Sequence, residues 1–272
     1  MYKIPSQYSG HFFCVNRAVR LGNALARLIQ CGMVASIALS CGLGEEGEAP
    51  LMDEPIAAPL LSAAPPTLAP PIRFAEGAAG AGIDFVHETG AFGEKWMPET
   101  MGSGCVLFDY DGDLDLDLLL LNGRWWPGHP QGGSVPTQRF YRNRGDGTFA
   151  ERTREVGLDI ELYGMGAAAG DYDGDGDIDL YLTALGDNLL LRNEGGRFVD
   201  VTAAAGVAGQ RWRDGAGQEQ PEWSSGAVFF DADRDGWIDL FVANYVRWSP
   251  ATDLFTTVDG VNKSYATPQQ YD

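Results

Sequence analysis

Three short stretches of the sequence carry an aspartate at almost every second position, over residues 109–117, 171–179 and 231–239. In a tight loop, the side chains at positions 1, 3, 5 and 9 of each stretch would surround one point, and position 7 could add its backbone carbonyl. Hard oxygen ligands in this number suit Ca²⁺, whereas Mg²⁺ demands a stricter octahedron. The candidate metal ligands are Asp109, Asp111, Asp113, Asp115, Asp117, Asp171, Asp173, Asp175, Asp177, Asp179, Asp231, Asp233, Asp235, Trp237 and Asp239.

Crowded carboxylates make a metal-free loop of this kind unfavourable. Two carboxylates about 4 Å apart repel each other by roughly 4 kcal/mol at an effective dielectric constant of 20. An EF-hand is excluded, because the bidentate Glu that it needs at position 12 is replaced by Leu120, Leu182 and Val242. The sequence therefore predicts about three calcium sites of another type, each closed by the aspartate at position 9. A solvated acidic turn is the alternative.

The first of the three loops departs from the other two at position 6. It has Leu114 there, whereas the other loops have Gly176 and Gly236. Glycine adopts the backbone conformation of a sharp turn without a steric penalty. We therefore expect the first loop to bind calcium most weakly, or to hold a distorted turn.

The acidic stretches belong to a longer repeat, because their first residues are 62 and 60 residues apart and a glycine lies five residues before each, at Gly104, Gly166 and Gly226. Short apolar runs bounded by turn residues flank the loops, and such runs are typical of buried strands. These expected strands cover residues 106–108, 118–121, 180–183, 228–230 and 240–243, with others at 140–142, 189–191 and 198–201. About four strands per 60 residues is typical of a β-propeller blade. We expect an all-β fold, an incomplete β-propeller of about three four-stranded blades.

The acidic stretches and the hairpin sequence from Arg142 to Phe149 (Arg-Asn-Arg-Gly-Asp-Gly-Thr-Phe) resemble FG-GAP/VCBS repeats, the blades of integrin-α-type propellers. More narrowly, residues 98–104, 243–246 and 267–271 are similar to segments of the cartilage acidic protein family and its bacterial relatives. The resemblance implies a seven-bladed propeller that is stapled by Ca²⁺, is usually extracellular and is used for binding.

The N-terminal region differs from the repeats. Residues 1–40 contain four Lys or Arg and no acidic residue, and an apolar stretch runs from Leu28 to Leu39, which is typical of an export signal and too short for a transmembrane helix. Cys41 follows small residues and is a candidate lipidation site for membrane attachment. We expect an export segment over 1–41, with a buried helix of the fold as the alternative. Residues 42–71 hold seven of the fifteen prolines and no aromatic residue, which predicts a disordered linker before the repeats at 72–272.

The overall composition excludes one class of partner and gives little sign of enzyme chemistry. The chain has 19 Lys and Arg against 38 Asp and Glu, a formal net charge of −19. Nucleic-acid binding depends on Lys and Arg that neutralise phosphates, so we expect no nucleic-acid partner. His87 and His129 lie outside any metal-binding spacing, and the sequence has no Gly-x-Ser-x-Gly nucleophile motif. We therefore expect a protein that is not an enzyme.

Insertions between the repeat landmarks are the candidate ligand-binding loops, because such insertions gather on one face of a repeat protein. They contain tryptophan and arginine, which are common binding hot spots. The candidate ligand face consists of Trp125, Trp126, Arg211, Trp212, Arg213 and Trp223. The alternative is that these tryptophans pack between blades.

Three acidic loops provide too few blades for a closed propeller, which has at least four. We expect either a truncated chain or one whose missing blades lie on another chain. The leading hypothesis is an exported, calcium-binding propeller segment for protein or glycan recognition at an extracellular, periplasmic or outer-surface location. One alternative is a polysaccharide hydrolase or lyase that uses Glu99 or Glu222; another is a structural fragment without activity of its own.

Overall fold

The structure is a computed structural model that describes residues 73–271 of the chain. The described part is mostly β structure, with fourteen strands, two single-turn α-helices and three short 3₁₀ helices. The export segment expected over 1–41 and the linker expected over 42–71 lie outside the described residues. No helix in the described part is long and apolar enough to cross a bilayer.

The first repeat folds into a four-stranded antiparallel sheet with the strand order β1-β2-β3-β4. The strands are β1 (Cys105–Phe108), β2 (Asp117–Leu120), β3 (Arg139–Asn143) and β4 (Phe149–Glu151). Successive side chains of a strand point to opposite faces, and the paired residues Leu119 and Phe140 are wholly buried on one of them. The helix α1 (Thr153–Val156) follows β4 and ends at Gly157 in a left-handed conformation.

The second repeat builds the same sheet again, in the order β5-β6-β7-β8. The strands are β5 (Gly164–Gly170), β6 (Asp179–Ala184), β7 (Leu189–Asn193) and β8 (Phe198–Asp200), followed by the helix α2 (Thr202–Ala205). All six residues of β6 are buried, which shows that this strand is covered on both faces. The prediction of four strands per repeat is confirmed for these two repeats.

The third repeat forms two strands of such a sheet within the described residues, β11 (Ser224–Phe230) and β12 (Asp239–Asn244). The prediction of about three four-stranded blades is therefore corrected to two complete sheets and one half-sheet. The physical reason is that the chain after β12 leaves the sheet. It forms the 3₁₀ helix η2 (Pro250–Thr252), the hairpin of β13 (Thr256–Thr257) and β14 (Lys263–Ser264), and the 3₁₀ helix η3 (Pro268–Gln270). A separate hairpin of β9 (Arg211–Arg213) and β10 (Glu219–Pro221) precedes β11.

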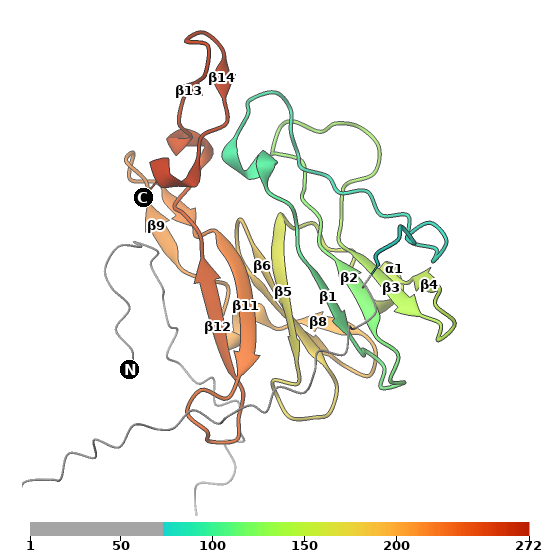
Figure 1. Cartoon of the computed structure of the whole chain (residues 1–272). Helices are drawn as coiled ribbons and strands as arrows, with labels where there is room; N and C mark the ends of the chain where they lie inside the picture. The colour runs from blue at the N-terminus through green and yellow to red at the C-terminus, as the bar shows by residue number, and fades with distance from the viewer. Residues whose placement is uncertain (1–72, 272) are drawn as a thin grey trace, which may run out of the picture. The chain divides into compact units, whose positions relative to one another are not determined.

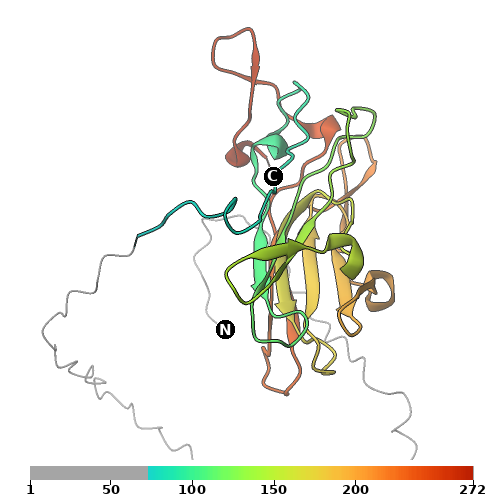
Figure 2. The same cartoon turned by 90° about the vertical axis from the view of Figure 1, so that its right-hand side faces the viewer.

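The three sheets lie side by side, with their first strands β1, β5 and β11 next to one another (Figure 1; Figure 2 gives the view turned by 90°). Apolar side chains fill the space between consecutive sheets. The cluster between the first and second sheets contains Phe108, Leu119, Leu121, Phe140, Leu180, Leu182 and Leu191. The cluster between the second and third contains Ala168, Tyr181 and Leu190, packed against Ala227, Phe229, Leu240 and Val242. The second sheet therefore packs against the first sheet with one face and against the third sheet with the other.

This packing explains the glycine that lies five residues before each acidic loop. A Cβ atom on Gly104 would lie 2.8 Å from the carbonyl oxygen of Met165 and 3.1 Å from the Cα of Gly166. A Cβ atom on Gly166 would lie 3.0 Å from the carbonyl oxygen of Ser225 and 3.2 Å from the Cα of Gly226. The first strands of neighbouring sheets approach so closely that no side chain fits. A Cβ atom on Gly226 would have nothing within 4 Å.

Alanine is expected to destabilise the protein at Gly166 and to change its stability little at Gly226. Gly166→Ala should lower the free energy of unfolding by about 1–3 kcal/mol, because overpacking forces the backbones of two sheets apart. Gly226→Ala is the matched control and should stay within about 0.5 kcal/mol of the wild type, since its Cβ position is open. Urea denaturation measures the free energy of unfolding of both variants. Equal losses in the two variants would contradict the close approach of β5 and β11.

Candidate metal centres

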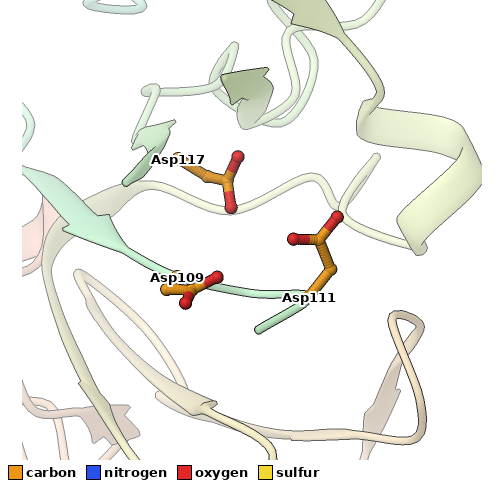
Figure 3. Close-up of side chains that lie close together, drawn as sticks. All are labelled: Asp109, Asp111 and Asp117. Carbon is orange, nitrogen blue, oxygen red and sulfur yellow. The ribbon is translucent and has the colours of Figure 1, made fainter. Parts of the chain in front are cut away.

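Each acidic loop joins the first two strands of its sheet and brings three carboxylates together. In every loop, one oxygen from each of the aspartates at positions 1, 3 and 9 lies within 4.8 Å of the others. The triads are Asp109, Asp111 and Asp117; Asp171, Asp173 and Asp179; and Asp231, Asp233 and Asp239. Figure 3 shows the first triad, whose carboxylates are arranged around a common centre. This donor set consists of hard oxygen ligands of the kind that Ca²⁺ prefers.

The aspartate at position 1 holds the turn in place. In the second loop, the Asp171 carboxylate accepts the backbone N–H groups of Gly174 at 2.7 Å, Asp175 at 3.1 Å and Gly176 at 3.0 Å. Asp109 accepts the three equivalent N–H groups in the first loop. The loop therefore wraps around this carboxylate, which sets the directions of the other side chains.

The aspartate at position 9 connects the loop to the third strand of the sheet. Asp179, the first residue of β6, is wholly buried and accepts the N–H of Tyr172 at 3.0 Å and that of Asn193 at 2.8 Å. In the same way Asp117 accepts the N–H of Asn143, the last residue of β3. Sequence reasoning missed this role of the asparagines, although the recurring Arg-Asn pair at the end of β3 and β7 was the available signal.

One hydrogen bond also crosses from the second sheet to the first loop. The side-chain amide of Asn193 donates to the backbone carbonyl of Tyr110 at 2.9 Å. The backbone N–H of the same Asn193 binds Asp179 of the second triad. A single residue therefore contacts the acidic loops of two consecutive sheets.

The third loop lacks the link to a third strand. Its position 9 residue, Asp239, accepts the N–H of Ala232 at 2.9 Å. Within the described part of the chain, no strand pairs with the other edge of β12, so nothing there corresponds to Asn143 or Asn193. Asp239 is accordingly half-buried, whereas Asp179 is wholly buried.

The electrostatics of the second loop favour a bound cation. Burial raises the pKa of Asp179 to about 6, although its two backbone N–H partners act in the opposite direction. The pKa of Asp173 is also raised, first by burial and then by Asp175. One carboxylate oxygen of Asp173, Oδ1, is buried and has no hydrogen-bond partner. A buried unpaired carboxylate oxygen is costly, and a cation held by the triad would supply its missing partner.

The side chains at positions 5 and 7 lie outside the triads. Asp113, Asp175 and Asp235, at position 5, each accept the N–H two residues further along, at 2.9–3.0 Å. At position 7, Asp177 accepts the N–H of Gly195 in the hairpin between β7 and β8 at 3.0 Å. Of the fifteen predicted ligands, the structure thus brings nine side chains together in three groups. Four of the other predicted side chains, Asp113, Asp175, Asp177 and Asp235, accept backbone N–H groups instead.

The first loop carries two features that weaken a calcium site. Leu114 has a left-handed backbone with φ of 71°, which costs a residue with a side chain about 1–2 kcal/mol. In addition, the guanidinium of Arg142 lies 2.8 Å from Asp111 and 3.1 Å from Asp113, where it competes with a metal cation. Leu114 adopts the positive φ that Gly176 and Gly236 have in the other loops, so the first loop keeps the same turn under strain instead of a distorted one. Its weaker calcium binding stays a prediction.

Leu114→Gly is expected to relieve this strain. Leu114 is 88% exposed, so its removal sacrifices little buried surface, and the free energy of unfolding should rise by about 0.5–1 kcal/mol. Calcium affinity of the first loop should rise with it, which calorimetric titration measures. The control is Leu116→Gly, at an exposed position without positive φ in the same loop, which should destabilise the protein. Equal effects would contradict strain at Leu114.

The structure divides the predicted ligand face into buried and exposed residues. Trp126 and Trp223 are 6% and 1% exposed and belong to an aromatic cluster with Tyr163 and Trp248. They contribute to the core instead of presenting a surface, because the insertions fold over the ends of the sheets and bury their own tryptophans. Trp125 is half-buried.

The exposed part of the predicted ligand face is the β9–β10 hairpin. Arg211 and Arg213 alternate with half-buried Trp212, whose indole N–H donates to the carbonyl of Pro221 at 3.0 Å. Arg211 forms an ion pair with Asp187 at 2.6 Å. The hairpin therefore presents two guanidinium groups, and the hydrogen bond of Trp212 to Pro221 holds its two strands together.

The two glutamates considered for acid–base chemistry lie in different surroundings. Glu99 in the 3₁₀ helix η1 (Met97–Thr100) is 6% exposed, and burial raises its pKa. Its Oε2 accepts the hydroxyl of Tyr265 at 3.2 Å, while Oε1 has no hydrogen-bond partner. Glu222 is held by the side-chain amide of Asn244. The two carboxylates share no hydrogen-bond partner among the described residues.

Together, the fold and the sites define a class: a β-sheet repeat protein with an aspartate-rich loop between the first two strands of each sheet. Residues 109–182 match the FG-GAP-like repeat family. The matched segment starts at the first acidic loop, includes the second and ends in β6. The predicted resemblance to FG-GAP repeats is confirmed over these residues. No curated protein matches the chain.

Proposed function

We propose that the chain is an exported, calcium-binding β-propeller segment that recognises a protein or glycan ligand, with Ca²⁺ in a structural role. The observation that carries the calcium assignment is the recurrence of one carboxylate triad, from positions 1, 3 and 9, in three consecutive sheets. A chance acidic turn would not place the same three positions together three times.

The calcium ions would fix the loops and the sheets behind them. Each ion would bind carboxylates from both ends of a loop, and in the second loop Asp179 carries this connection on to the last residue of β7. The likeness of the loops to extracellular calcium modules would place their Kd near 10⁻⁴–10⁻³ M. Such sites fill where calcium is abundant, which agrees with the export segment expected over 1–41 and with a lipid anchor at Cys41.

Side-by-side packing of the sheets supports the propeller assignment. Blades of a propeller are four-stranded antiparallel sheets arranged radially, with their first strands innermost. The first two sheets have this composition, and β1, β5 and β11 adjoin as innermost strands would. FG-GAP repeats form blades of this kind, and further blades, on this chain or on another, would complete the ring.

Ligand recognition is assigned to the insertion face, where the β9–β10 hairpin offers exposed arginines. Exchanging Arg211 and Arg213 for Glu should lower the affinity for a protein or glycan ligand at least about tenfold, because arginines are frequent hot spots. A glycan array and a panel of extracellular matrix proteins, probed in calcium and in EDTA, supply the ligands. Arg154→Glu is the control, at a side chain in α1 that is 90% exposed. Binding unaffected by both arginine changes would remove the hairpin from the ligand face.

A polysaccharide hydrolase or lyase is the second candidate function, favoured by the buried carboxyl of Glu99. Its raised pKa and its unpartnered oxygen are properties of a general acid. Turnover of a glycan that is abolished in Glu99→Gln, with unchanged melting temperature, would establish this function. Absence of turnover on every glycan tested would rule out the enzyme and leave ligand binding as the proposed function.

A further inference from the structure

The outer face of the third sheet exposes apolar side chains that its counterparts bury. Val228 and Phe230 on β11 are 48% and 45% exposed. At the same repeat positions of β1, Val106 and Phe108 pack into the cluster between the first and second sheets, where Phe108 is 4% exposed. The exposed face of the third sheet is thus equivalent to the face of the first sheet that packs against the second sheet.

The first sheet exposes the complementary surface. Cys105 and Leu107 on β1 are exposed, Leu107 to 56%. Their counterparts on β5, Ala167 and Ala169, pack against the cluster that the second sheet shares with the first. The exposed face of the first sheet is thus equivalent to the face of the second sheet that packs against the first sheet.

We propose that the third sheet of one copy of this chain packs on the first sheet of a second copy, head to tail. The contact would continue the two sheet–sheet interfaces that already exist within the chain, and both halves of it are present on every molecule. Such heterologous contacts close into rings when the rotation permits. Two copies joined at both ends would bring together four complete sheets and two half-sheets, a number within the four to eight blades of known propellers.

The glycine pattern defines the register of this contact. Gly104 lies against the Met165 carbonyl and the Gly166 Cα, and Gly166 against the Ser225 carbonyl and the Gly226 Cα. By the same rule, Gly226 would lie against the carbonyl of the residue before Gly104, and against the Cα of Gly104, in the second copy. The open space at the Gly226 Cβ position is then the place that the second copy occupies.

Sedimentation velocity of the full chain in calcium tests the proposal. The wild type should associate as its concentration rises. Phe230→Asp blocks the third-sheet face and Leu107→Asp the first-sheet face; both side chains are exposed in the single chain, so each variant should remain folded by circular dichroism. Each should associate at least about 30-fold more weakly, the effect of losing a hot-spot residue. Mixed together, they should form one-to-one dimers through their two intact faces.

Two further measurements keep the outcome decisive. Gly226→Ala should leave the melting temperature of the monomer unchanged and abolish association, because its methyl group meets only the second copy. Alkylation of Cys105, followed by peptide mass spectrometry, should slow as the protein associates. A wild type that remains monomeric at its highest attainable concentration overturns the proposal. Association that survives in Leu107→Asp also overturns it, since the contact would then join two third sheets.

The proposal is independent of the calcium and ligand functions. It rests on sheet packing, and calcium titration of the monomeric variants reports the metal sites separately. A variant that loses association but keeps calcium binding would show that its residue acts in the contact with the second copy. A variant that loses calcium binding but keeps association would show that its residue acts in a metal site.

Discussion

Chelation of calcium should lower the melting temperature of this protein by about 8–16 °C. At a Kd near 10⁻⁴ M and about 1 mM Ca²⁺, each site adds roughly 1.4 kcal/mol to the free energy of unfolding, and three sites about 4 kcal/mol. For a domain of this size, about 1 kcal/mol shifts the melting temperature by roughly 2–4 °C. Differential scanning calorimetry with and without EDTA measures the shift directly.

The ion specificity of this effect provides its control. Calcium returned in excess of EDTA should restore the melting temperature, whereas Mg²⁺ should restore less, because it demands an octahedral site and releases its water reluctantly. Potassium at the same ionic strength separates ion binding from the screening of carboxylate repulsion. An unchanged melting temperature in EDTA would contradict the calcium assignment for all three triads.

Asp179→Ala should be the most damaging single change among the candidate ligands. It leaves the buried N–H groups of Tyr172 and Asn193 without acceptors, at about 1–3 kcal/mol each. It also removes the second calcium site. We expect the free energy of unfolding in calcium to fall by about 4 kcal/mol or more, measured by chemical denaturation.

Three comparisons isolate the causes of that loss. Asp239→Ala should cost less than half as much, because Asp239 is half-buried and accepts one N–H. Asp187→Ala, at an exposed ion pair of the same sheet as Asp179, should cost less than about 1 kcal/mol. Asp179→Asn keeps one acceptor and removes a buried charge, so it should lose the calcium response with a smaller loss in EDTA. Similar losses at Asp179 and Asp187 would contradict the site.

The sequence was sufficient to predict the acidic loops and most strands of the repeats, because both depend on local patterns. The apolar runs beside the acidic stretches became β1, β2, β6, β11 and β12, whereas β5 was not expected, because residues 167–170 are Ala-Ala-Ala-Gly. The three acidic loops followed from the period of the repeat. Leu114 marked the strained position of the first loop, since it takes the positive φ that the other two loops give to glycine.

What the sequence could not predict depends on competition between backbone and side chains and on long-range packing. Alternating aspartates do not show which carboxylates face the ion, and Asp175 turned to a backbone N–H instead. Trp126 and Trp223 stood in insertions, and only the packing of those insertions showed that they are core residues. The departure of the chain after β12 had no local signal, because residues 249–271 carry ordinary turn residues.

The hydrogen bonds of Asn193 join two candidate metal sites that belong to consecutive sheets. Its backbone N–H binds Asp179 of the second triad, and its side chain holds the carbonyl of Tyr110 in the first loop. An ion that orders the second loop orders Asn193, so the first loop loses less conformational entropy when its own ion arrives. We therefore expect calcium uptake at these two loops to be cooperative, with Asn193 as the residue that couples them.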